Sequence, residues 1–218
     1  MPDNAGPLEV MQRQYVDQME AIKRRTAAIK KLSEIAATGQ ISPEIATESI
    51  YLQFRKILEL IAMSSLVANK QAMKKVNQSL MKKLWRGSEI LKRIERINPD
   101  FYPVPLIEKP HPDPIVKTDL VDKTDGFLSR AEFRRLYNLC GSFMHADNPL
   151  GRKKTDYEAL WKKGPEWQNK IMELLGCHKI RLVDQDGFYL VHMNEERDGR
   201  VHMYQFAKLH SDPQGSKT

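Results

Sequence analysis

Residues 127–149, FLSRAEFRRLYNLCGSFMHADNP, carry the side chains best suited to chemistry. Placed on a helix, with successive residues rotated by about 100°, Arg134, Asn138, Gly141 and His145 fall within about 60° of one another. A histidine can exchange protons near neutral pH, and an arginine can stabilise a phosphate in a transition state. Such a pair suffices, without a metal, to cleave RNA through the RNA's own 2′-hydroxyl.

Arg134, Asn138, Gly141 and His145 would form a polar stripe on the helix. The spacing of this stripe restricts how its residues could act together. Arg134 precedes His145 by eleven residues, roughly 16 Å along a helix axis. We therefore expect His145 of one chain to meet Arg134 of a second chain in a homodimer, and we take His145, Arg134 and Asn138 as candidate catalytic residues. The alternative is that His145 only caps the C-terminus of its helix, helped by Asp147 or Asn148.

A second candidate site lies in the earlier segment SIYLQFRKILELIAMSSLVANK. Arg55 and Glu59 are four residues apart and are therefore neighbours on a helix surface. Apolar residues share their side of the helix, so we expect the pair to be partly desolvated. The pair is either a polar binding site inside the bundle or a structural contact that fixes helix packing.

Residues 74–96 are strongly basic, which favours an anionic partner. This segment contains eight lysines and arginines but only two acidic residues, Glu89 and Glu95. Its net charge of +6 is nearly the whole formal charge of +7. The candidate binding residues are the basic side chains Lys82, Lys83, Arg86, Lys92 and Arg93. They predict a helix face that binds the phosphate backbone of RNA. The alternatives are a solvated helix face, or a docking face for an acidic protein.

We expect no metal and no cofactor. The segment DKTDGFLSRAEF fits only half of a calcium-binding loop, because Val121 and Lys123 occupy ligand positions. A hairpin closing over residues 194–200 would place His192 opposite His202, but two histidines alone rarely define a zinc site. The most apolar run, residues 57–68, is too short to span a membrane, and the N-terminus lacks the pattern of a secretory signal. We expect a cytoplasmic protein.

Hydrophobic periodicity predicts a mainly α protein with five helices. These helices cover about residues 8–37, 43–72, 76–97, 129–145 and 155–175, the last with a break at Gly164-Pro165 as an alternative. Residues 98–118 contain six prolines and are predicted to be an extended connector within a bundle that covers residues 1–176. Residues 177–210 predict a three-stranded antiparallel β meander with Asp-Gly turns, followed by a disordered tail at 211–218.

The segments 51–70 and 127–149 resemble the HEPN superfamily of bacterial helical bundles. Many members are metal-independent RNases of phage-defence or toxin–antitoxin type, in which an Arg-x4–6-His motif forms its active site across a dimer. His145 matches the histidine of that motif. The window for the arginine is Asn138, Leu139 and Cys140, and none of these is basic. The resemblance therefore implies the fold and dimerisation more than activity.

Together these patterns predict a HEPN-like, dimer-forming protein that binds RNA or a nucleotide, with weak or absent cleavage. One alternative is an active metal-independent endoribonuclease, which uses His145 as acid and base with Arg134 or Arg55 supplying charge. The other alternative is a non-enzymatic adaptor for an acidic protein.

Overall fold

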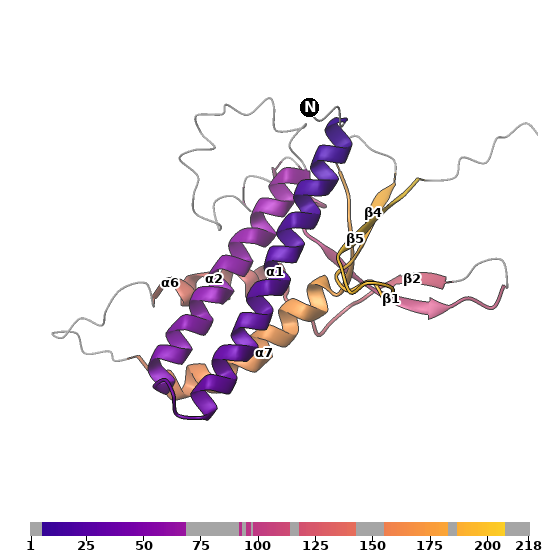
Figure 1. Ribbon diagram of the computed structural model, residues 1–218. Coiled ribbons are helices and arrows are strands. Elements are labelled where there is room, and N and C mark those ends of the chain that lie inside the picture. Colours follow the sequence, from indigo (N-terminus) through magenta and orange to yellow (C-terminus); the bar gives the residue numbers. More distant parts are fainter. Residues whose placement is uncertain are drawn as a thin grey trace, which may run out of the picture.

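The computed structural model, shown in Figure 1, describes residues 6–68, 92, 95–96, 98–113, 118–142, 155–182 and 187–207. In this part of the chain four helices accompany a five-stranded sheet. The helices are α1 (Pro7–Ala37), α2 (Pro43–Ala68), α6 (Arg130–Ser142) and α7 (Tyr157–Leu175). The strands are β1 (Val104–Pro110), β2 (Thr118–Asp122), β3 (Cys177–Ile180), β4 (Phe188–His192) and β5 (His202–Phe206).

The long helices α1 and α2 form the frame of the helical layer and run side by side (Figure 1). Helix α1 buries an apolar stripe made of Met11, Tyr15, Met19, Ile22 and Ile29. At the start of α2, the backbone amide of Ile45 donates a hydrogen bond to the Ser42 hydroxyl over 3.3 Å, as expected of an N-cap. Both α6 and α7 pack on α2, so α2 is the central helix.

The prediction of a mainly α protein with a three-stranded meander is wrong, and the protein is mixed α/β. All neighbouring strands are antiparallel, in the order β2-β1-β3-β4-β5. The three C-terminal strands lie next to one another, but β1 and β2 extend the sheet on the far side of β3. The proposed boundary at residue 176 would therefore separate β1 from the strand with which it pairs.

The segment predicted as a connector forms β1. Proline fixes φ near the values of an extended chain, so it is compatible with a strand where no amide donor is needed. Pro105 lies in a ladder to β3 that is only two residue pairs long, whereas β1 and β2 share five pairs. In Figure 1 the β1–β2 hairpin projects away from the helices. The proline content of this segment explains why no strand is predicted there from the sequence.

The sheet uses one face for the core. His178, Ile180, Tyr189 and Val191 alternate along β3 and β4 and are all buried. Ile180, Tyr189 and Val191 join the hydrophobic core cluster that contains the apolar faces of α1, α2 and α7. Cys177, at the start of β3, and His192, at the end of β4, are only partly buried and occupy the other face of the sheet.

Helix α7 is continuous through Pro165, so the alternative of a break at Gly164-Pro165 is wrong. Of the predicted helix 76–97, the structure describes residues 92, 95 and 96, which are helical. The predicted tail lies outside the described residues. Within the described ranges, no helix combines the length and apolar character needed to cross a membrane.

Candidate functional site

Arg55 and Glu59 form the ion pair that their spacing on α2 predicts. Arg55 Nε donates a hydrogen bond to Glu59 Oε1 over 2.9 Å. The side chains keep 21% and 32% of their surface exposed, respectively. The pair is therefore partly desolvated and still open to a ligand from solvent.

Contacts with α6 hold the Arg55 guanidinium in place. Arg55 Nη1 donates to the carbonyl of Tyr137 over 3.3 Å, and the guanidinium carbon lies 3.7 Å from the centroid of the Tyr137 ring. A Cβ atom added at Gly141 would lie 3.3 Å from Nη1. A glycine at this position therefore allows the arginine to approach the helix closely.

The apolar face of α6 packs into the core. Phe133, Leu136, Tyr137 and Cys140 are buried. Burial raises the pKa of the Cys140 thiol to about 12, although the nearby Arg55 charge opposes this rise. Cys140 is therefore a protonated core residue at neutral pH and not a nucleophile.

The polar stripe of α6 does not converge on Arg55. Arg134 and Asn138 are exposed, and Arg134 Nη2 lies 3.2 Å from Glu95 Oε2. Arg130 Nη1 contacts the other oxygen of the same carboxylate over 3.1 Å. The structure therefore places Arg134 in a surface ion-pair network with the preceding helical segment, whereas Gly141 of the same stripe meets Arg55.

Several candidate residues lie outside the part of the chain that the structure describes. They are the catalytic candidate His145 and the basic residues Lys82, Lys83, Arg86 and Arg93. Lys92 is described, and it is exposed. For His145 and for the basic face, the predictions from sequence therefore remain predictions.

A capping box fixes the start of α6. The Ser129 amide and hydroxyl both donate to Glu132 Oε2, over 3.0 and 2.9 Å, and Lys170 of α7 donates to the other oxygen. Burial opposes ionisation of Glu132, but the hydrogen bonds from Lys170 and Ser129 outweigh it and lower the pKa to about 2. This network fixes α6 against α7 and so helps to position Tyr137 and Gly141.

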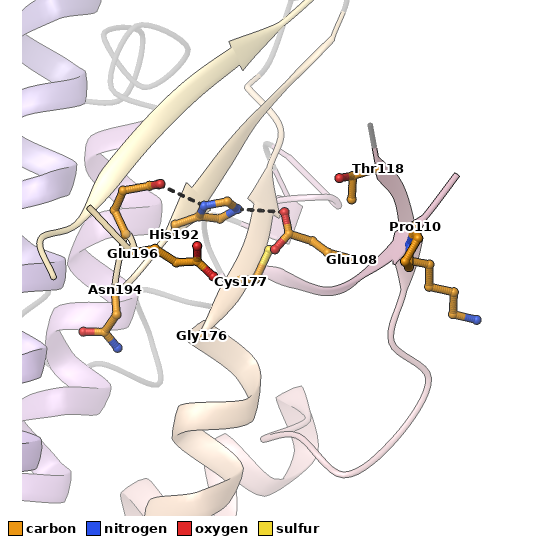
Figure 2. A pocket seen from close by; sticks show the side chains of 10 residues that line it. Glu108, Pro110, Thr118, Gly176, Cys177, His192, Asn194 and Glu196 are labelled. Atoms are coloured by element: carbon orange, nitrogen blue, oxygen red, sulfur yellow. Dashed lines mark hydrogen bonds and ion pairs between the residues drawn. The ribbon is translucent and has the colours of Figure 1, made fainter. Parts of the chain in front are cut away.

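A second polar cluster, which sequence reasoning missed, lies on the exposed face of the sheet. Glu108, Cys177 and His192 come from β1, β3 and β4, and one potential ligand atom from each lies within 4.8 Å of the others. A cavity of about 520 Å³ opens beside them. Figure 2 shows the side chains that line it. The hairpin register predicted for His192 and His202 is confirmed, because these residues are directly paired.

The sequence signal for this cluster was incomplete. Glu108 lies in the segment predicted as a connector, and Cys177 is the first residue of the segment predicted as a meander. Cys177 and His192 are paired across β3 and β4, but they are fifteen residues apart in the chain. The carboxylate of Glu108 joins Cys177 and His192 only because β1 pairs with β3.

No family model, no curated protein and no solved structure matches this chain.

Proposed function

We propose that the protein binds RNA or a nucleotide through a phosphate contact at Arg55, with weak or absent cleavage. The observation that carries this proposal is the fixed guanidinium at the junction of α2 and α6. Arg55 uses Nε and Nη1 in its contacts with Glu59 and Tyr137, and its Nη2 makes no hydrogen bond with the described residues. A guanidinium fixed in this way loses little rotamer entropy when it binds a phosphate.

The rest of the chain supports an anionic ligand. The formal charge of +7 raises the local concentration of a polyanion, and the basic segment 74–96 is the largest source of that charge. His145 follows Gly141 by only four residues in the chain, and the proposal keeps it as the candidate acid and base. The proposal includes a homodimer, in which a second chain supplies residues to the same site.

The charge balance favours binding over cleavage. Glu59 neutralises part of the Arg55 charge, and Arg134 is paired with Glu95. Neither arginine is then fully available to stabilise the additional negative charge of a transition state. We therefore propose a ligand-binding protein and leave endoribonuclease activity as an outcome of the test.

Two substitutions that remove charges of opposite sign test the phosphate contact. Labelled single-stranded RNA is titrated with wild type, Arg55→Gln and Glu59→Gln at two salt concentrations. Both variants break the same ion pair, but we expect Arg55→Gln to weaken binding about tenfold, the value of one charge-assisted hydrogen bond. Glu59→Gln removes the competing carboxylate and should keep or raise the affinity.

Arg200→Gln serves as the charge control, because it removes one positive charge from an exposed residue in the β4–β5 turn. We expect it to change affinity by less than about twofold, and we expect all complexes to weaken as salt rises. Equal weakening by Arg55→Gln and Arg200→Gln, or binding that is insensitive to salt, would refute the proposal.

Cleavage and assembly are measured on the same samples. RNA is incubated with wild type and His145→Ala in the presence of a chelator, and product that depends on His145 would make the protein an endoribonuclease. Light scattering gives the mass in solution, and a mass of one chain would exclude the shared dimer site.

A further inference from the structure

We propose that Glu108, Cys177 and His192 form a binding site for a divalent transition metal ion of the Zn²⁺ type, on the face of the sheet that points away from the helices. This site is separate from the proposed RNA site and does not depend on it. Figure 2 shows its three side chains converging from neighbouring strands at the edge of the cavity.

The sheet register brings the three donors together. Cys177 and His192 are directly paired across β3 and β4, so their side chains share one face. In β1, continuing the alternation from the Pro105–His178 pair puts Glu108 on that same face. Each donor therefore comes from a strand that backbone hydrogen bonds hold in position.

The donor separations fit a metal with small adjustments. A tetrahedral zinc ion has bonds of about 2.0–2.3 Å, so its donors lie roughly 3.3–3.8 Å apart. The potential ligand atoms all lie within 4.8 Å of one another. Rotation of the half-exposed Glu108 side chain can close a difference of about 1 Å without moving the strands.

The hydrogen bonds of His192 leave one ring nitrogen without a suitable partner. Nδ1 donates to Glu195 Oε2 over 3.2 Å, because a carboxylate oxygen can only accept. In the neutral ring, Nε2 then carries a lone pair that lies 3.3 Å from Glu108 Oε1. The two atoms are close, yet the buried Nε2 forms no hydrogen bond with the described residues.

A lone pair that faces a carboxylate is repelled unless a positive charge lies between them. A second proton on the imidazole or a bound metal ion would supply that charge. Cys177 favours the metal, because a sulfur adds little to an imidazolium–carboxylate pair but is a strong zinc ligand. Burial, together with the Glu108 charge, raises the pKa of the Cys177 thiol to about 12, so metal binding must displace its proton.

The surroundings of His192 resemble the outer shell of a metal site. Zinc-bound histidines commonly donate their second nitrogen to a carboxylate, which fixes the ring and raises its basicity. Glu195 fills this role here, and the Tyr204 hydroxyl donates to the same carboxylate oxygen over 2.8 Å. The hydrogen bonds from Tyr204 and His192 lower the pKa of Glu195, so this carboxylate is ionised at neutral pH.

The cavity leaves room for a further ligand on the ion. Among the residues that the structure describes, its lining carries the carboxylates of Glu108, Glu195 and Glu196 and the ammonium of Lys109. Three protein ligands leave one tetrahedral position free, as in zinc sites that hold a water molecule or a substrate. The negative lining favours a cation, and the free position would face the cavity of about 520 Å³.

Cobalt titration tests the site directly. Untagged full-length protein, first freed of metal with a chelator, is titrated with Co²⁺ under reducing conditions. We expect one equivalent to bind and to produce the near-ultraviolet charge-transfer band of a cobalt–thiolate bond. Zn²⁺ should displace the cobalt and abolish the band, and affinity should rise with pH because the thiol loses a proton.

Matched variants assign the ligands. Cys177→Ser should abolish the band, whereas Cys140→Ala, which removes the other free cysteine, should retain it. Glu195→Gln leaves the three ligands in place and should weaken binding about 10- to 100-fold. This third variant provides a test even where Cys177→Ser fails to fold, which circular dichroism reveals.

Three results would overturn the proposal. They are a wild-type protein that retains no metal at one equivalent, a band that persists in Cys177→Ser, and a wild-type affinity in Glu195→Gln.

Discussion

The hydroxyl of Tyr15 on α1 donates a hydrogen bond to Nε2 of His178 on β3 over 2.8 Å, and both residues are fully buried. On the other side of the ring, Nδ1 donates to the carbonyl of Leu175, the last residue of α7, over 2.8 Å. The ring thus has one fixed tautomer and links three elements. Since both nitrogens are satisfied inside the core, we assign His178 a structural role.

Removing the Tyr15 hydroxyl should destabilise the protein measurably. Tyr15→Phe leaves His178 Nε2 buried without a partner, which we expect to cost about 1–3 kcal/mol. Urea-induced unfolding followed by circular dichroism measures the change. Tyr157→Phe removes an exposed hydroxyl bonded to Glu48 and should cost less than about 1 kcal/mol. Equal losses in the two variants would contradict the assigned role.

His178 should make the stability depend on pH below neutrality. Burial lowers the pKa of His178 from 6.5 to about 4, so the unfolded chain binds a proton that the folded chain excludes. Stability is therefore lost as pH falls from about 6.5 to about 4, by up to roughly 3 kcal/mol. Urea unfolding of wild type and His178→Gln across this range tests the prediction. The stability difference between them should shrink as pH falls, and a constant difference would refute it.

Glu132 should be the acidic residue that stabilises the α6–α7 junction. Glu132→Ala removes both the capping box and the contact with Lys170, and we expect a loss of about 1–2 kcal/mol. Because the pKa of Glu132 is lowered to about 2, its contribution is complete above pH 4.5 and is lost as pH falls toward 2. Thermal unfolding at neutral pH measures the first effect. Glu166→Ala removes the more exposed partner of Lys170 and should cost less than about 0.5 kcal/mol.

Two glycines in turns should respond differently to the same substitution. Gly187 has φ of +124°, and an added Cβ would lie 2.1 Å from the carbonyl oxygen of Phe206. Gly199 has φ of +65° and open space around it. We expect Gly199→Ala to cost about 1–2 kcal/mol and Gly187→Ala more than about 3 kcal/mol, because only the latter also forces β4 and β5 apart. Similar unfolding midpoints for the two variants would show that the close contact is absent.

The local features of the molecule could be predicted from the sequence. The α1 stripe, the Ser42 cap, the Ser129–Glu132 capping box and the Arg55–Glu59 pair all follow from spacings of three or four residues. Gly187 and Gly199 have the positive φ angles expected of the Asp-Gly turns. These signals are readable because the interacting groups are close neighbours in the chain.

Only the tertiary structure decided which strands pair and which polar side chains meet. Nothing in the segment around Pro105 indicates its pairing with β3, because the partner lies more than seventy residues away. The pairing of Arg134 with Glu95, and the meeting of Glu108, Cys177 and His192, likewise join distant segments. Helical periodicity reports which face of an element is buried, but not the neighbour that covers it. The helices and the Arg55–Glu59 pair were therefore determined locally. The strand order of the sheet, the contacts of Arg55 with α6 and the cluster of Glu108, Cys177 and His192 arose from long-range packing.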